Sequence, residues 1–128
     1  MRILGIDYGD KKIGLAIAED IIAEPFQVLR YDSRDWAVKK IIDIIKREKI
    51  GKIVVGVSEG ESRKKTESFS DLLRKLINIP LCYSDETLTT QTAQKLSLEA
   101  SVKKTKRRRL EDAYAAAVML QLYLEQHV

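Results

Sequence analysis

Two apolar runs lie within the first 18 residues of the chain, and only four residues separate them. The first run covers residues 2–7 and the second covers residues 12–18. Two strands with so short a connection must pair as an antiparallel hairpin, because a parallel pair needs a crossover of about a dozen or more residues. Asp7 ends the first strand beside a turn of glycine and lysine. This acid is either ordinary turn chemistry or part of a metal or phosphate site.

Beyond the hairpin, short apolar runs alternate with stretches whose apolar residues recur at helical spacing. Strands reached through helices should lie parallel to the first strand, by right-handed crossovers. The sequence therefore predicts one α/β domain over residues 1–128, with a five-stranded mixed sheet whose first three strands are antiparallel, flanked by helices. The further elements expected are strands at 26–31, 52–57 and 80–84, and helices after Ser33 and at 62–77, 89–98 and 110–126.

The composition narrows the class of protein. A chain of 128 residues that is 45% hydrophobic suits one globular core. The single cysteine, Cys82, excludes an internal disulfide and is compatible with a reducing cytosol. No run approaches the roughly 18 to 20 apolar residues of a membrane span, and we see no signal peptide. We therefore expect a cytoplasmic protein without a membrane partner.

The positive charge is concentrated in one segment. Six lysines and arginines occupy seven residues, 103–109, and without these six charges the formal net charge falls from +4 to −2. Such a cluster suits a polyanionic partner, although a solvated charge run on a loop would look the same.

Acidic residues follow the predicted parallel strands. Asp7 ends the first strand, Glu59 follows the fourth, and Asp85 and Glu86 follow the fifth. Ligands of open α/β sheets gather outside the carboxyl ends of the parallel strands. We therefore expect these acids to share one edge of the sheet.

The last helix contributes a further acid. Tyr114 and Gln121 mark its polar stripe, and Asp112 points about 160° away from Tyr114 at 100° per residue. Asp112 is therefore predicted on the buried side with Ala116, whereas Glu111 lies closer to the polar stripe. Acids are stabilised at the positive N-terminal end of a helix, which would explain why Asp112 is in the first turn. It would not explain why Asp112 faces the buried side.

Clustered carboxylates repel each other unless a cation compensates their charge. Hard oxygen ligands suit Mg²⁺ or Mn²⁺, and such ions support phosphodiester hydrolysis. The single histidine, His127, lies at the end of the chain, so zinc and histidine-based chemistry are not expected. Cationic residues lie near these acids in the sequence, and an acid cluster flanked by cations is typical of a nuclease site. The candidate substrate contacts are Gly9, Lys11, Lys12, Thr89, Lys104, Arg107 and Arg108.

Four motifs, "GIDYGDKKIGLA", "KIVVGV", "SDETLTT" and "LEDAYAAAVMLQLYLE", together resemble the YqgF/RuvX family over nearly the whole chain. These are small RNase H-like proteins described as Holliday junction resolvases or as nucleases that trim the 5′ end of pre-16S rRNA. The resemblance implies an RNase H-like fold, a role in ribosome biogenesis, and Mg²⁺- or Mn²⁺-dependent cleavage of nucleic acid, either pre-rRNA or branched DNA. It also implies that Asp7, Glu86 and Asp112 are the catalytic, metal-holding acids.

Two positions depart from the family pattern. Thr87 stands where the family usually has arginine, and the loop "GVSEGES" lacks the usual proline. Strands one and five should also lie two strands apart, with backbones roughly 10 Å from each other. Glu59 is therefore kept as a substitute metal ligand for Glu86, and Asp85 also stays open.

Two other functions fit parts of the pattern. Actin-like and sugar-kinase ATPases use a similar aspartate hairpin, but they close two such domains on a nucleotide. A non-catalytic nucleic-acid-binding module needs only the basic segment, with the acids as caps and turns. A junction resolvase would need two sites and hence a dimer, so both a monomer and a homodimer remain open.

Overall fold

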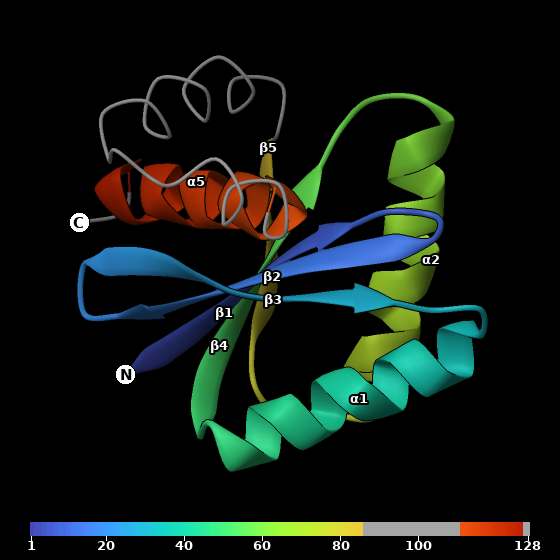
Figure 1. Cartoon of the computed structure of the whole chain (residues 1–128), viewed down its shortest axis with the longest axis horizontal. Coiled ribbons are helices and arrows are strands. Elements are labelled where there is room, and N and C mark those ends of the chain that lie inside the picture. Colours follow the sequence, from blue (N-terminus) through green and yellow to red (C-terminus); the bar gives the residue numbers. More distant parts are fainter. Residues whose placement is uncertain (86–110, 127–128) are drawn as a thin grey trace.

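The computed structural model of the chain describes residues 1–85 and 111–126 (Figure 1). Within these ranges five strands form one sheet in the order β3-β2-β1-β4-β5. The helix expected at residues 89–98 lies outside the described residues. No helix in the described ranges is long and apolar enough to cross a membrane.

The first three strands form two consecutive antiparallel hairpins: β1 covers Arg2–Tyr8, β2 covers Lys12–Glu19 and β3 covers Ile22–Arg30. Two later strands, β4 (Ile50–Val57) and β5 (Leu81–Asp85), continue the sheet parallel to β1. The predicted mixed sheet with three antiparallel strands at its start is confirmed.

Strand β3 begins at Ile22, four residues before the predicted start at Phe26. The prediction was wrong here because Pro25 was taken to precede the strand. Proline removes one ladder hydrogen bond, and an edge strand tolerates that loss. β3 is an edge strand, and the pairing register shifts between Leu15 and Ala16, where Ala16 faces Pro25.

The three described helices are α1 (Arg34–Arg47), α2 (Glu61–Arg74) and α5 (Glu111–Gln126). Ser33 is the N-cap of α1, as predicted, and its hydroxyl accepts a hydrogen bond of 3.3 Å from the Trp36 amide. Helix α2 ends three residues earlier than the predicted Ile77. Leu76 falls inside the predicted range but beyond the end of α2, and it is 58% exposed.

The sheet separates two apolar cores. Helices α1 and α2 cover one face, where Ile41 and Phe69 pack with Leu4 and Ile6 of β1. Helix α5 covers the other face, where Met119 and other α5 residues pack against the remaining side of the strands. Burial on both faces explains why β1 and β4 read as continuous apolar runs rather than as alternating strands.

Candidate active site

The parallel strands β1, β4 and β5 end together at one edge of the sheet, which we call the carboxyl rim. Asp7 of β1 pairs in register with Gly56 of β4, and Gly56 pairs with Ser84 of β5. Asp85 is the next residue of β5 and is exposed. The register confirms the prediction that these strands deliver their carboxyl ends to a common rim.

Asp7 lies on the face of the sheet that α5 covers. Side chains alternate along a strand, so Asp7 shares its face with Ile3 and Gly5. Ile3 belongs to the α5 core, and Gly5 lies directly under α5. The following residue, Tyr8, points to the opposite face and stacks on Phe69 of α2, with ring centroids 4.5 Å apart. The half-buried Asp7 is thus the α5-facing residue at the rim.

The direction of α5 follows from its contacts. Near its C-terminal end, the Tyr123 hydroxyl accepts a hydrogen bond from Lys52, which is in register with Ile3 at the start of β1. One turn earlier, Leu120 packs over Gly5. The helix therefore runs antiparallel to β1, and its first turn, which contains Asp112, begins near the end of β1 that carries Asp7.

The burial of the α5 side chains agrees with the predicted faces in part, because Val118, about 40° from Tyr114 at 100° per residue, is also buried. Ala116, which was expected to share a side with Asp112, is buried, and so are Met119 and Tyr123, which lie on the same side at helical spacing. Gln121 is half-buried and Glu125 is exposed, as expected for the polar stripe. Gln121 accepts a hydrogen bond from the Ala23 amide and so ties α5 to the hairpin of β2 and β3.

The turn between β1 and β2 brings two candidate phosphate contacts to the rim. Lys11 and Lys12 are both exposed there. A Cβ on Gly9 would lie 2.6 Å from the Lys12 carbonyl oxygen, so the compact turn requires glycine at this position. Gly9 therefore has a backbone role in the turn, whatever contact it makes with a substrate.

Tyr31, which was not predicted as a site residue, holds this turn in place. Its hydroxyl donates a hydrogen bond to the Gly9 carbonyl, and its amide donates one of 3.1 Å to the Lys11 carbonyl. Burial raises the pKa of Tyr31 above its ordinary value, and the neighbouring Tyr8 and Asp10 add to the rise. The hydroxyl therefore stays protonated at neutral pH and continues to donate to Gly9. A tyrosine at the end of a predicted strand gives no sign of this role in the sequence.

The acids predicted to follow the fourth and fifth strands and to join Asp7 at the rim are either exposed or outside the described residues. Glu59 is exposed and lies two residues beyond β4, and β4 separates β1 from β5. Within residues 1–85 and 111–126, no group of three histidine, cysteine or acidic side chains could hold a metal ion. The predicted site residues outside the described ranges are Glu86, Thr89, Lys104, Arg107 and Arg108, and Thr87 lies there too.

The sequence of the chain matches one family model and several proteins with the same name over nearly its whole length. The family model RuvX, described as Holliday junction resolvase, matches residues 1–126. The chain is 37% identical over 134 residues to a "Putative pre-16S rRNA nuclease" of Caldanaerobacter subterraneus subsp. tengcongensis, covering 98% of this chain and 96% of the relative. It is 34% identical to the protein of the same name from Dictyoglomus turgidum, covering 98% and 94%.

Two solved structures share the fold at low sequence identity. The RuvC protein of T. thermophilus in complex with a Holliday junction substrate matches with a TM-score of 0.72 and 15% identity, covering 100% of this chain and 97% of that one. The fowlpox virus Holliday junction resolvase matches with a TM-score of 0.66 and 14% identity, covering both chains fully. The expected RNase H-like fold is thereby confirmed.

Proposed function

The chain belongs to the RuvX family, and from this membership we propose that it is a metal-dependent nuclease that hydrolyses phosphodiester bonds in structured nucleic acid. The observation that carries the proposal is the position of Asp7. This acid ends the central strand of the sheet, on the face where the first turn of α5 begins. A strand-end carboxylate and a helix that carries a second one are what a metal-assisted phosphodiesterase needs.

The proposed metal ligands are Asp7, Glu86 and Asp112, with Glu59 or Asp85 as the substitutes for Glu86. Their carboxylate oxygens are hard donors, which fit Mg²⁺ or Mn²⁺. The half-buried position of Asp7, next to the α5 core, fits a ligand that is held in one orientation by its surroundings. When bound, the ion would supply an activated water and stabilisation for the leaving oxygen.

The residues of the β1–β2 turn would bind the substrate. Lys11 and Lys12 are exposed beside Asp7 and can neutralise phosphates on either side of the cleaved bond. Tyr31 keeps the turn in position through Gly9, so the two lysines start from a fixed backbone. Lys104, Arg107 and Arg108 would add further phosphate contacts.

For the substrate we propose the 5′ end of pre-16S rRNA, because the relatives that match nearly the whole chain carry that name. A second candidate is a four-way DNA junction, which is favoured by the description of the family. A junction has two strands to cut and would require two copies of this chain, whereas a single active site suffices for trimming an RNA end.

The experiment compares both substrates in one assay. The purified protein is incubated with a stem-containing RNA that carries the 5′ extension of 16S rRNA, and separately with a four-way DNA junction. Each reaction contains Mg²⁺, Mn²⁺ or a chelator. We expect cleavage of the RNA that stops with the chelator and returns when metal is added back. Cleavage of the junction alone would favour the resolvase.

Binding of both substrates without cleavage under any metal condition would reject the nuclease and leave a binding module. Tight Mg²⁺-dependent binding of ATP would instead favour the nucleotide-binding class.

A further inference from the structure

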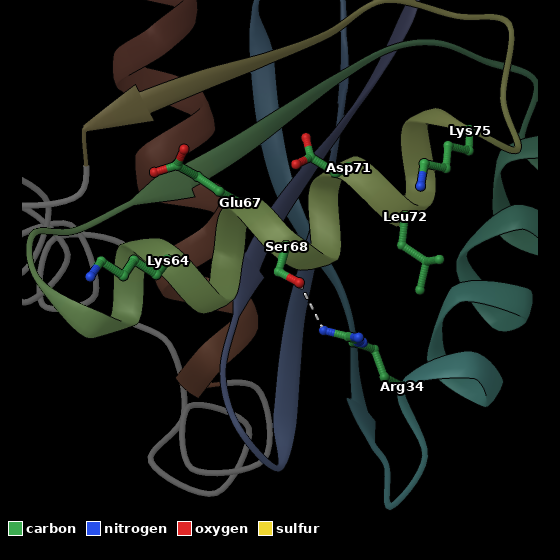
Figure 2. A pocket seen from close by; sticks show the side chains of 7 residues that line it. All are labelled: Arg34, Lys64, Glu67, Ser68, Asp71, Leu72 and Lys75. Carbon is green, nitrogen blue, oxygen red and sulfur yellow. Dashed lines mark hydrogen bonds between the residues drawn. The ribbon is translucent and has the colours of Figure 1, made fainter.

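A shallow hollow of about 510 Å³ lies between the start of α1 and one side of α2, and we call it the α2 hollow. Three cationic side chains line it: Arg34 from α1, Lys64 from α2, and Lys75, the C-cap residue of α2 (Figure 2). The Arg34 guanidinium donates a hydrogen bond of 3.1 Å to the Ser68 hydroxyl, which bridges the two helices. Leu72 adds an apolar wall. The hollow is on the face of the sheet opposite to α5.

The carboxylates of the α2 hollow are already engaged by arginines outside it. Glu67 lies 3.1 Å from the Arg63 guanidinium, and Asp71 lies 3.8 Å from that of Arg74. Figure 2 shows both acids extending away from the side of α2 that faces Arg34.

The cations, by contrast, are not neutralised. Within the described residues, Arg34, Lys64 and Lys75 form no ion pair with any acid. The hollow therefore presents an excess of positive charge with hydrogen-bond donors and no carboxylate aimed at them. An anionic ligand is the complement of such a surface.

The α2 hollow also adjoins the carboxyl rim. Lys65, the neighbour of Lys64, lies 3.3 Å from Asp10 in the β1–β2 turn, next to Lys11 and Lys12. This ion pair carries no net charge of its own, but it places the first half of α2 beside the turn that carries Lys11 and Lys12. Among the candidate phosphate contacts, Lys11 and Lys12 lie in that turn, and the α2 hollow would extend their surface onto α2.

We propose that the α2 hollow binds the phosphate backbone of the same nucleic acid that Asp7 would cleave, and that its partner is the second strand of a duplex region. This inference rests on the proposed function. Asp7 and the hollow lie on opposite faces of the sheet, so one ligand must be wide enough to reach both. A duplex has that width without bending, whereas a single strand would have to wrap around the rim. Phosphates are recognised by lysine and arginine without reading sequence, which suits a contact remote from the cleaved bond.

The test measures how salt changes binding. The double variant Lys64→Ala/Lys75→Ala is compared with the parent, in the presence of a chelator, on a 20-base-pair RNA duplex and on one of its strands. As the control, Lys39→Ala/Lys46→Ala removes two exposed lysines from the far side of α1. Each lost phosphate contact lowers the slope of log K against log salt by about 0.7 to 0.9.

Raising the salt from 50 to 200 mM lowers the duplex affinity of both proteins. We expect the factor by which it lowers the affinity of the Lys64→Ala/Lys75→Ala variant to be about ten times smaller than the factor for the parent. The control should behave as the parent, and single-strand binding should change little. Equal slopes for both double variants on the duplex would overturn the proposal, as would an equal loss on the duplex and on the single strand. Cleavage by the parent is scored separately. A changed slope without any cleavage would retain the α2 hollow as a binding surface and reject the nuclease.

Discussion

Leu120 of α5 lies directly over Gly5 of β1, so close that a Cβ on residue 5 would be 3.0 Å from the Cβ of Leu120. Leu120 Cδ2 follows at 3.2 Å, and the carbonyl oxygen of Ala116 at 3.4 Å. This contact sets how closely α5 approaches the central strand. Because Asp7 lies two residues further along β1, the same contact sets the distance between Asp7 and the first turn of α5.

Gly5→Ala should therefore push α5 away from the sheet. We expect a loss of about 1–3 kcal/mol in the free energy of unfolding, because a tightly packed contact receives an extra methyl group. Nuclease activity should fall as well, because Asp112 moves with α5. Denaturant unfolding and cleavage rates measure the two effects. Leu120→Ala removes the Leu120 Cδ2 contact at 3.2 Å but keeps the Cβ contact at 3.0 Å, so in that background the cost of Gly5→Ala should shrink in part. Strictly additive losses in this double-mutant cycle would contradict the proposed contact.

Tyr123 links α5 to the start of the sheet through Lys52, and we expect this link to make the free energy of unfolding depend on pH. Its hydroxyl accepts a hydrogen bond from the Lys52 ammonium, which raises the pKa of Lys52 despite the opposing effect of burial. A raised pKa in the folded protein stabilises it below the ordinary lysine pKa of about 10.4, and this stabilisation is lost as the pH rises through the folded value. Tyr123→Phe should cost about 1 kcal/mol near pH 8.

The difference between Tyr123→Phe and the parent should shrink above the ordinary lysine pKa, as the Lys52 ammonium loses its proton. Unfolding curves at several pH values test this. Tyr114→Phe, a half-buried position on the same helix, is the control and should show no such pH dependence. A constant difference at every pH would show that the hydrogen bond does not depend on the charge of Lys52.

The second metal ligand can be identified by comparing three acids. Glu86→Gln should lower the cleavage rate by at least about 100-fold, because substitutions that only support a ligand already cost 10 to 100-fold. Asp85→Asn and Glu59→Gln should stay within about fivefold of the parent, since both side chains are exposed in the structure. Cleavage is measured over a range of Mn²⁺ concentrations. A larger loss from Glu59→Gln than from Glu86→Gln would reassign the ligand to the loop after β4.

The basic segment before α5 should contribute much of the nucleic-acid affinity. Replacing residues 106–109, which are one lysine and three arginines, by glutamine removes four charges. If each contacts a phosphate, the slope of log K against log salt should fall by about 3. The Lys39→Ala/Lys46→Ala variant again controls for net charge. An unchanged slope would mean that this segment is a solvated charge run.

Most of the fold could be predicted because its signals are local. The short turn between β1 and β2 forces a hairpin, and Ser33 with the apolar residues that follow it at helical spacing marks α1. The start of β3 and the end of α2 were predicted wrongly, because at both points tertiary structure overrides the local sequence rule. Pro25 is compatible with β3 only because that strand is at the sheet edge, and Leu76 lies beyond the point where α2 ends.

The candidate site could be predicted only in part, for the same reason. Asp7 alone could be ordinary turn chemistry, and it became a candidate because further acids follow the other parallel strands of an open sheet. The α2 hollow had no sequence signal. Arg34 and Ser68 are 34 residues apart and meet only because α1 and α2 pack on the same face of the sheet. Tyr31 reaches Gly9 through strand pairing in the same way.

The most direct test of the central claim is the cleavage rate of Asp7→Asn beside that of Asp10→Asn. Both substitutions remove one carboxylate charge from the same part of the chain. Within the described residues the ion pair of Asp10 is the exposed one with Lys65, whose loss costs at most about 1 kcal/mol. Unfolding curves and substrate affinity are measured for both variants. We predict that Asp7→Asn binds the substrate but cleaves it at least about 100-fold more slowly, while Asp10→Asn cleaves at nearly the parental rate. Cleavage by Asp7→Asn at the rate of the parent would contradict the proposed active site.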